Sequence, residues 1–515
     1  MELAAGYDSL PYPSKFFLQT HPDRLATLGK LFGMNPQTPE KCRILELGCG
    51  NGSNLISHAF NLPESEFVGV DISGEHIKAA KDWANELNLQ NIHFHEIDLL
   101  EMNVADFGKF DFITAHGLIS WIPEFVRKKV FELFAEMLAE NGIGYISYNA
   151  YPGAHYRKIA RDVMRFHTKN IENPVEKVQN AISFLSFVAE NSNETKTYKP
   201  LLEKELHRHF EHSASDIYHD DLSEVYEPYY FHEFADLLDQ HELQYLSEAE
   251  MHAMSIQKFP AKVQEHINQF DDVIEREQLI DFFLGRVFRQ TLFCRKNVKL
   301  ERNLTPNQLD DFLIASAIHP QNDDPDLFTA KTERFVDNKN FGIEIDHPPT
   351  KFALKLLGEN WGKAVPTAEM METIQKTFTE NDVIPEDWEK ELEITRAILF
   401  QIYRGTDLIE LHTHQPKADQ TVAEKPKING LARWQIKETD HVTTLYGLNI
   451  KVEDEVSRHL LELLDGTNDR SELLVQIRNF IENNDEIEGK NDLLENIDNW
   501  LDSSLQQLAK LGMFA

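Results

Sequence analysis

The residues with the clearest chemistry form a short glycine-rich segment, Glu46-Leu47-Gly48-Cys49-Gly50-Asn51-Gly52. It follows an apolar run at 43–47 and precedes a stretch with helical spacing. Glycine lets a backbone approach a ligand closely, and the first turn of a helix offers unpaired N–H groups. We therefore expect a small-molecule site here, with Glu46, Gly48, Cys49, Gly50 and Gly52 against the ligand.

The spacing of the glycines selects among nucleotide-like ligands. A dinucleotide fingerprint, G-x-G-x-x-G, would place its third glycine at position 53. This chain has Ser53 there and Gly52 one position earlier. G-x-G-x-G with an acid two residues before it, here Glu46, is typical of class I methyltransferases that use S-adenosylmethionine, which is therefore the expected cofactor.

Two acids end the next two strand-like segments and extend this site. Asp71 closes the run at 66–71, where a carboxylate can accept hydrogen bonds from both ribose hydroxyls. Asp98 closes the following run and is expected at the adenine edge. Ile72 and Leu99, which follow these acids, are predicted to contact the cofactor with them.

The methyl acceptor is expected over the carboxyl ends of the fourth and fifth strands. Transfer from a sulfonium mainly needs alignment and exclusion of water. His116 follows the fourth strand and could take a proton as well as contact the cofactor. Tyr148 and Asn149 end the fifth strand and would orient the acceptor, and Trp121 would wall its channel. Packing roles for His116 and Trp121 remain open from the sequence.

The order of elements predicts the architecture that must position these residues. Strand-like runs at 43–47, 66–71, 91–97, 110–115 and 143–148 alternate with helical stretches such as 123–140. This alternation indicates a parallel sheet covered on both faces. We expect an α/β, doubly wound, Rossmann-like domain at 1–165, a mostly helical region at 166–305, a winged-helix-like unit at 306–414, a linker at 415–430 and a second winged-helix-like unit at 431–515.

Composition narrows the class of partner. The chain of 515 residues has 51 Lys and Arg against 86 Asp and Glu, a net charge of −35, which disfavours nucleic acid. Three cysteines argue for a reducing compartment. With no signal-like N-terminus and no apolar run of about 20 residues, we expect a cytoplasmic protein without a membrane span. No histidine cluster has the pattern of a metal site.

Several further segments resemble one bacterial family. These segments are Tyr7–Tyr12 (YDSLPY), 19–22 (QTHP), 31–33 (LFG), 116–123 (HGLISWIP), 147–153 (SYNAYPG), 286–292 (RVFRQTL) and 464–467 (LDGT). Together with ELGCGNG they are similar to methyltransferases that carry a methyltransferase regulatory domain. The best understood relatives are rickettsial protein-lysine methyltransferases that modify outer-membrane proteins.

The resemblance implies a protein-lysine N-methyltransferase, with a bacterial outer-membrane protein, in its unfolded state, as the candidate substrate. It also implies that Tyr7, Tyr12 and His21 cap the cofactor and that the middle region builds a homodimer. The chain departs from the family where Ala154-His155 follow the segment ending at Gly153, because a tryptophan is expected there. A small-molecule methyltransferase and a non-catalytic, cofactor-binding regulator are the two alternatives.

Overall fold

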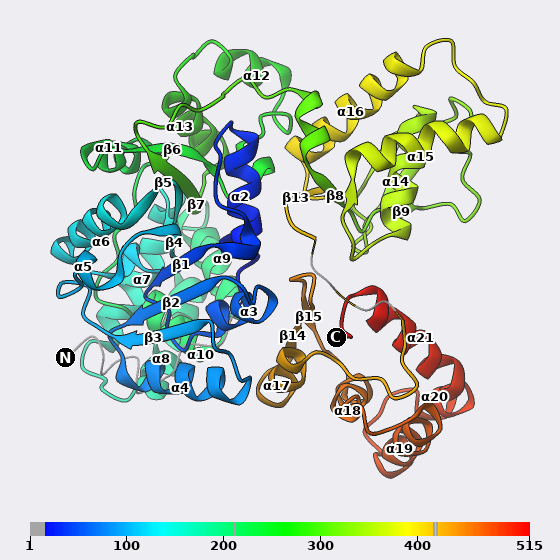
Figure 1. Ribbon diagram of the computed structural model, residues 1–515. Coiled ribbons are helices and arrows are strands. Elements are labelled where there is room, and N and C mark those ends of the chain that lie inside the picture. Colours follow the sequence, from blue (N-terminus) through cyan, green and yellow to red (C-terminus); the bar gives the residue numbers. More distant parts are fainter. Residues whose placement is uncertain (1–15, 211, 416–417, 419–420, 515) are drawn as a thin grey trace.

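The computed structural model describes residues 16–210, 212–415, 418 and 421–514. The N-terminal half forms a layered α/β body, and two smaller units follow it (Figure 1). Among the described residues, no helix is long and apolar enough to cross a membrane.

A mixed sheet of seven strands forms the centre of the α/β body, in the order β3-β2-β1-β4-β5-β7-β6. The first five strands are mutually parallel, and β7 and β6 add in antiparallel fashion. The strands are β1 (Arg43–Leu47), β2 (Glu66–Asp71), β3 (Ile92–Glu96), β4 (Phe110–Ala115), β5 (Leu138–Asn149), β6 (Leu243–Glu248) and β7 (Phe288–Arg295). The doubly wound prediction is thereby confirmed.

Helices cover both faces of this sheet and bury two separate apolar cores. Residues of α2 (Pro22–Leu31), α3 (Ser53–Asn61) and α4 (Gly74–Glu86) pack on one face. Residues of α6 (Glu124–Met137) and α11 (Phe231–Gln240) pack on the other, near the short α5 (Val104–Phe107). The helix expected at 123–140 ends at Met137, because the chain turns directly into β5.

The last two strands of the sheet come from the region expected to be mostly helical. β7 pairs with β5 through residues 288–294 and with β6 on its other side, so these two strands complete the sheet. In β7, Leu292, Phe293 and Cys294 are all buried. A strand buried on both faces lacks the polar alternation by which strands are recognised, which explains why the sequence did not indicate it.

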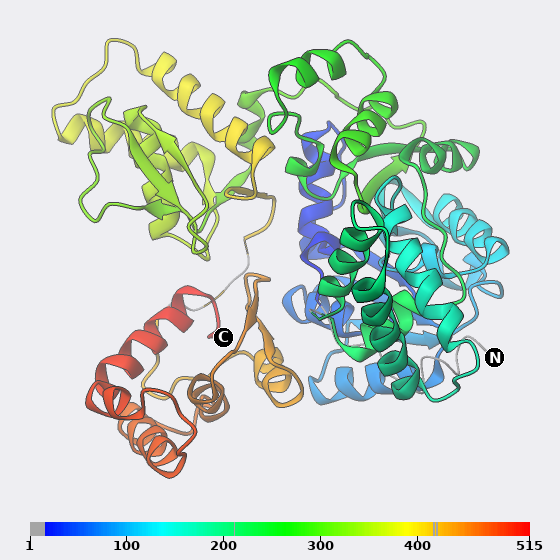
Figure 2. The same cartoon turned by 180° about the vertical axis from the view of Figure 1, so that it is seen from behind.

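The helices that follow β5 and precede β6 along the chain form a helical layer, which faces the viewer in Figure 2. It consists of α7 (Ala154–Thr168), α8 (Pro174–Asn191), α9 (Tyr198–Phe210), α10 (Ala214–Asp216) and a π-helical turn at Ile217–Asp221. Its own apolar core includes Met164, Leu185 and Leu202. Helices α12 (Ala261–Ile267) and α13 (Val273–Leu284) then lead from β6 to β7.

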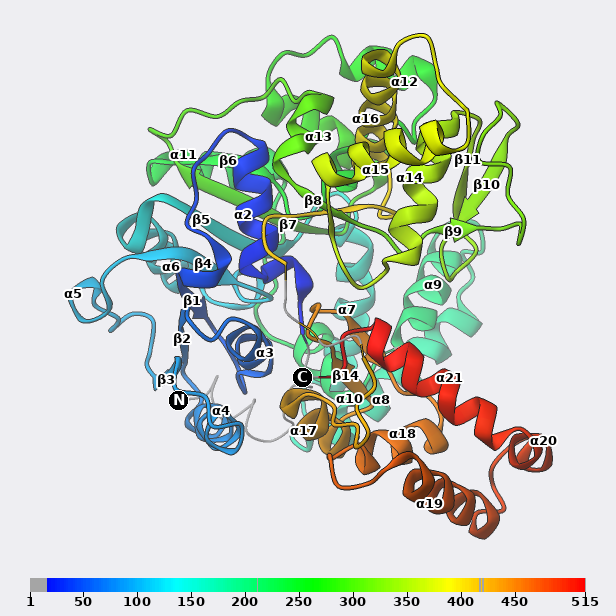
Figure 3. The ribbon, with the colours of Figure 1, turned by 45° about the vertical axis from the view of Figure 1, so that its right-hand side comes forward.

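The middle unit combines three helices with short strands. Its elements are β8 (Leu313–Ala315), β9 (His319–Pro320), β10 (Glu333–Val336), β11 (Gly342–Ile345), α14 (Pro348–Glu359), β12 (Val365–Pro366), α15 (Thr367–Glu380), α16 (Trp388–Gly405) and β13 (Glu410–His412). Helix α2 contacts β13 and β5, and so lies between the sheet and this unit (Figure 3).

The C-terminal unit has its own apolar core and touches the α/β body. It contains α17 (Gly430–Glu438), β14 (His441–Thr443), β15 (Asn449–Lys451), α18 (Glu455–Leu463), α19 (Arg470–Asn483), α20 (Lys490–Glu495) and α21 (Ile497–Lys510). The rings of Trp83 on α4 and Trp434 on α17 lie 4.6 Å apart. The glycine loop, which joins β1 to α3, therefore belongs to a body that the C-terminal unit contacts directly.

Candidate functional site

The glycine loop lies across the ends of β1 and β2. The N–H groups of Gly48 and Cys49 donate to the Val70 carbonyl at 2.9 and 3.1 Å. Gly48, Gly50 and Gly52 have φ values of +72°, +54° and +76°, which only glycine adopts readily. A Cβ placed on Gly50 would meet no atom of the described residues within 4 Å, so they leave this side of the loop open to a ligand.

Asp71 is fixed beside the loop by backbone hydrogen bonds. The N–H of Gly50 donates to its Oδ2, and the N–H of Ser73 donates to its Oδ1, both at 2.9 Å. The Asp71 side chain is 14% exposed, and Ile72 beside it is 40% exposed. The end of β2 thus presents a carboxylate and an apolar surface side by side, as a nucleoside requires.

Three successive residues just after β3, Asp98, Leu99 and Leu100, lie in different surroundings. Asp98 accepts a hydrogen bond from the Leu100 N–H at 3.0 Å. The Leu99 side chain is buried in the sheet core, whereas Leu100 is 44% exposed. Leu99 stays a predicted cofactor contact, and Leu100 beside it offers the more open apolar side chain.

Glu46 provides the test of whether the loop suits the expected cofactor. The carboxyl group is buried, and its Oε1 accepts a hydrogen bond from Asn54 Nδ2 at 2.8 Å. Its Oε2 is buried and has no hydrogen-bond partner within the described part of the chain. Burial, with a contribution from the charge of Asp71, raises the pKa of Glu46 to about 7. An ammonium group such as that of S-adenosylmethionine would satisfy Oε2 and neutralise this carboxylate.

Asn54 continues this network away from the loop. Its amide donates to Thr20 Oγ1 at 3.0 Å, and Thr20 Oγ1 lies 3.0 Å from His58 Nε2. The His58 ring meets the ring of His21 edge-on at 4.8 Å. His21 accepts the Asp23 N–H at the start of α2, and burial lowers the pKa of His21 to about 4. The contacts thus link His21 to Glu46 through His58, Thr20 and Asn54.

His116, at the end of β4, lies between two aromatic rings. Its Nδ1 is 2.8 Å from the Tyr145 hydroxyl, and its ring stacks on Phe17 at 3.7 Å between centroids. The next residue, Gly117, donates its N–H to Ser147 Oγ at 2.7 Å. Tyr145 was not among the residues predicted from the sequence, although the alternation of β5 places it on the same face as Ser147.

The other predicted acceptor residues lie in different surroundings. Tyr148 is 1% exposed and stacks on Phe234 in the sheet core, with its hydroxyl 3.4 Å from Thr291 Oγ1. The Asn149 Oδ1 accepts from Arg157 at 3.3 Å. The Trp121 ring is 5.4 Å from that of Tyr226, and the Arg157 guanidinium lies over it. These contacts connect β5 and Trp121 to the helical layer. Tyr7 and Tyr12 lie outside the described residues.

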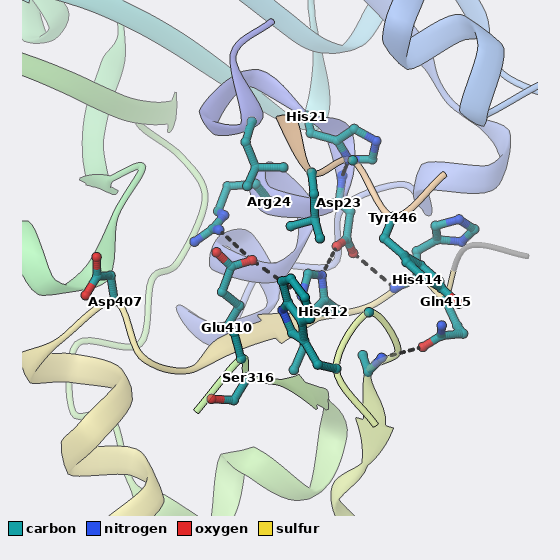
Figure 4. Close-up of a pocket in the computed structure, with 18 of the residues that line it drawn as sticks. His21, Asp23, Arg24, Ser316, Asp407, Glu410, His412, His414, Gln415 and Tyr446 are labelled. Carbon is teal, nitrogen blue, oxygen red and sulfur yellow. Dashed lines mark hydrogen bonds and ion pairs between the residues drawn. The ribbon is translucent and has the colours of Figure 1, made fainter. Parts of the chain in front are cut away.

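A cavity of about 300 Å³ lies where α2, the middle unit and the C-terminal unit meet (Figure 4). Asp23 crosses this junction: its Oδ1 accepts from the Thr413 N–H at 2.8 Å and the His414 N–H at 3.0 Å, and its Oδ2 is 2.7 Å from His412 Nδ1. Burial opposes the charged imidazole, but the hydrogen bond and charge of Asp23 raise the pKa of His412 above its ordinary value. The same pair lowers the pKa of Asp23.

Replacing His412 with glutamine is expected to destabilise the protein by about 1–2 kcal/mol near pH 6, where the ion pair is complete. A histidine whose pKa is raised on folding contributes stability below its unfolded pKa and loses it as pH rises through the folded pKa. The stability difference between wild type and variant should therefore shrink from pH 6 to pH 9. Melting temperatures from calorimetry measure this stability difference. His441→Gln is the control, because His441 forms an exposed ion pair with Asp440. An unchanged difference across this range contradicts the prediction.

Comparison with known proteins agrees with this geometry. Residues 39–210 match the family "Methyltransferase domain", residues 213–295 the "Predicted methyltransferase regulatory domain" and residues 424–513 the "PKMT, C-terminal winged helix domain". The expected cofactor-binding domain, regulatory region and C-terminal winged helix are thereby confirmed.

Individual relatives extend the match to nearly the whole chain. The protein RP789 of Rickettsia prowazekii is 32% identical over 486 residues, covering 92% of this chain and 86% of the relative. RP028 of the same organism is 35% identical over 230 residues, which are 44% of this chain and 92% of that protein. The structure of PKMT2 from Rickettsia typhi in complex with AdoHcy superposes with a TM-score of 0.87 and 27% identity, covering 98% of this chain and all of that one.

The glycine loop and the carboxylate of Asp71 form a site suited to S-adenosylmethionine, since the described residues leave Gly50 open and one Glu46 oxygen without a partner. The matched families and the full-length relative agree with that assignment. The chain belongs to the S-adenosylmethionine-dependent class I methyltransferases that carry a methyltransferase regulatory domain and a C-terminal winged helix of the PKMT type.

Proposed function

We propose that this enzyme transfers the methyl group to lysine side chains of a bacterial outer-membrane protein. The observation that carries the proposal is the full-length structural match to PKMT2 of Rickettsia typhi, which includes the C-terminal winged helix. The net charge of −35 supports a lysine-bearing polypeptide over an anionic substrate. We propose further that the enzyme works in the cytoplasm, on a substrate that has not yet folded, and that its middle region forms a homodimer.

The proposed cofactor contacts follow the ends of the first three strands. Glu46 would bind the ammonium group, Asp71 the ribose hydroxyls and Asp98 the adenine edge, with the loop backbone along the cofactor. Bound there, S-adenosylmethionine supplies an electrophilic methyl group on a sulfonium.

Lysine must reach that methyl group as a neutral amine, although its ordinary pKa is about 10.4. A neighbouring positive charge disfavours the ammonium form and so lowers the pKa of the lysine. His116 is the polar group at the end of β4, and the Tyr145 hydroxyl fixes one of its ring nitrogens. We propose that His116, held by Tyr145, orients the amine and receives its proton directly or through water.

The proposed function is tested with tritium-labelled S-adenosylmethionine in a lysate of cells lacking the enzyme. Protein and small molecules are separated, and methylated lysines are sought by mass spectrometry. Label on protein lysine is expected, with a rate that rises from about pH 7 to about pH 9 because a proton must leave first. Label only in a metabolite would replace the proposal with a small-molecule activity.

The acceptor residues are tested by three variants. His116→Ala and Tyr145→Phe are expected to lower turnover while leaving cofactor affinity nearly unchanged, because neither residue lies on the glycine loop. Tyr148→Phe is the matched comparison, since the sequence favoured Tyr148 whereas the Tyr145 hydroxyl touches His116. A loss of turnover in Tyr148→Phe alone would return the role to Tyr148.

The affinity for S-adenosylhomocysteine is expected to depend on the protonation of Glu46. Because burial raises its pKa to about 7, Glu46 must lose a proton before it pairs with the ligand's ammonium. Affinity should rise about tenfold from pH 5.5 to pH 7, where the α-amino group of the ligand stays charged. Calorimetry at several pH values measures this slope, and Glu46→Gln should remove it. An equal slope in that variant would exclude Glu46 as the source.

A further inference from the structure

Five exposed apolar side chains lie where α13 ends and β7 begins. They form what we call the mouth patch: Phe282, Phe283, Leu284, Val287 and Phe288, which are 51%, 48%, 38%, 57% and 38% exposed. Several large exposed apolar side chains within seven residues of the chain are characteristic of an interaction surface, whereas single ones are ordinary.

The mouth patch lies at the edge of the sheet where the acceptor must enter. β7 runs antiparallel to β5, so its first residue, Phe288, pairs with Asn149 at the carboxyl end of β5. The Ala150 N–H donates to the Val287 carbonyl at 2.9 Å, and the Gly153 N–H donates to the Arg286 carbonyl at 2.9 Å. The patch is therefore fixed to the end of β5 by backbone hydrogen bonds.

Aromatic rings join the patch to the proposed acceptor site. The Phe288 ring meets the His116 ring edge-on, with centroids 6.3 Å apart. On the other side, the Phe282 ring is 6.0 Å from Tyr230, and Tyr230 is 5.0 Å from Tyr151. His155 stacks on Tyr151 at 4.1 Å and so supplies an aromatic ring close to where the family resemblance led us to expect a tryptophan. An apolar surface thus begins at His116 and extends outward.

We propose that the mouth patch binds the apolar residues that flank the target lysine in an extended, unfolded polypeptide. This inference rests on the proposed function and names the surface that recognises its unfolded substrate. On a folded protein, the neighbours of an exposed lysine are mostly polar, and large apolar side chains lie inside. A site that places aromatic and aliphatic side chains beside the amine position therefore favours a chain whose apolar residues are still exposed.

The binding test uses a fluorescein-labelled, reduced and carboxymethylated lactalbumin as unfolded probe, and its disulfide-intact form as folded probe. The variant carries Phe282→Ser, Phe283→Ser and Val287→Ser, and leaves Phe288 in place beside His116. The matched control carries Phe187→Ser, Ile384→Ser and Val475→Ser, which are 59%, 66% and 58% exposed on other parts of the surface. Binding is measured by anisotropy and the KM by methyl transfer to the unfolded probe.

We expect the patch variant to bind the unfolded probe about tenfold more weakly and to raise its KM similarly, since interface anchors carry most of a binding energy. The control variant and the cofactor affinity of both proteins should match wild type. Equal binding in the patch variant overturns the inference, as does a wild-type dimer that the patch variant dissociates while probe binding is unchanged. Patch-dependent binding without methyllysine would refute the proposed function and leave the patch intact.

Discussion

Arg289→Met is expected to lower the free energy of unfolding of the α/β body by about 3–5 kcal/mol, because it leaves buried carboxylates without their cation. Arg289 is 1% exposed and contacts three acids: Asp281 through Nε at 2.8 Å, Glu248 through Nη1 at 2.5 Å and Glu277 through Nη2 at 3.1 Å. Its guanidinium also lies 3.9 Å from the centre of the Phe231 ring. This cluster joins β6, β7 and α13.

Scanning calorimetry measures the effect as a melting temperature lowered by on the order of 10 °C. The loss should be smaller at low pH. Burial raises the pKa of Glu277 to about 7 in the intact cluster, and carboxylates that take up protons no longer need the cation. Arg470→Met is the matched control, because both carboxylate partners of Arg470 are exposed. A melting temperature equal to that of wild type would show that the cluster does not stabilise the packing of β6 and β7 on α13.

Asp71→Ala is expected to weaken binding of S-adenosylhomocysteine by about 1.5–3 kcal/mol, roughly a 10- to 150-fold rise in Kd. The variant removes the acceptor for the ribose hydroxyls. It also removes the acceptor for the N–H groups of Gly50 and Ser73, so the loop loses the group that fixes its position. The first loss removes a contact from the complex, and the second lets the free loop leave the position that binding requires.

Isothermal calorimetry on the folded variant measures this change. Asp82→Ala is the matched control, because Asp82 lies on α4 in an exposed pair with Lys78. Unchanged affinity in a folded Asp71→Ala protein would remove Asp71 from the cofactor site, and a similar loss in the control would point to a general effect of charge.

The cofactor half of the fold was predictable because its signals are local. The strands expected at 43–47, 66–71 and 110–115 have those bounds in the structure, since each is a short apolar run ended by glycine or a polar residue. The loop spacing and Asp71 follow directly from these strand ends. The C-terminal winged helix was also predicted, from the spacing of its helices.

Pairing between distant segments was not predictable in the same way. Nothing in residues 288–295 alone shows that they lie beside β5, because that register depends on the assembled sheet. Tyr148 stays a prediction, and Tyr145 was not recognised from the sequence for a simpler reason. Both are near the end of β5, and only the alternation of faces, once the position of His116 is known, selects Tyr145.

The distance along the chain between β5 and its partner β7 has a consequence for biosynthesis. β5 ends at Asn149, and β7 ends at Arg295. At about 5–20 residues per second, the ribosome needs on the order of ten seconds to make the chain between them. During that time the edge of β5 has no strand to pair with, which is the condition under which edges associate wrongly. Slower translation of the helical layer would lengthen this exposure. The yield of folded protein should therefore fall when this stretch is translated more slowly, while the properties of the protein that does fold stay the same.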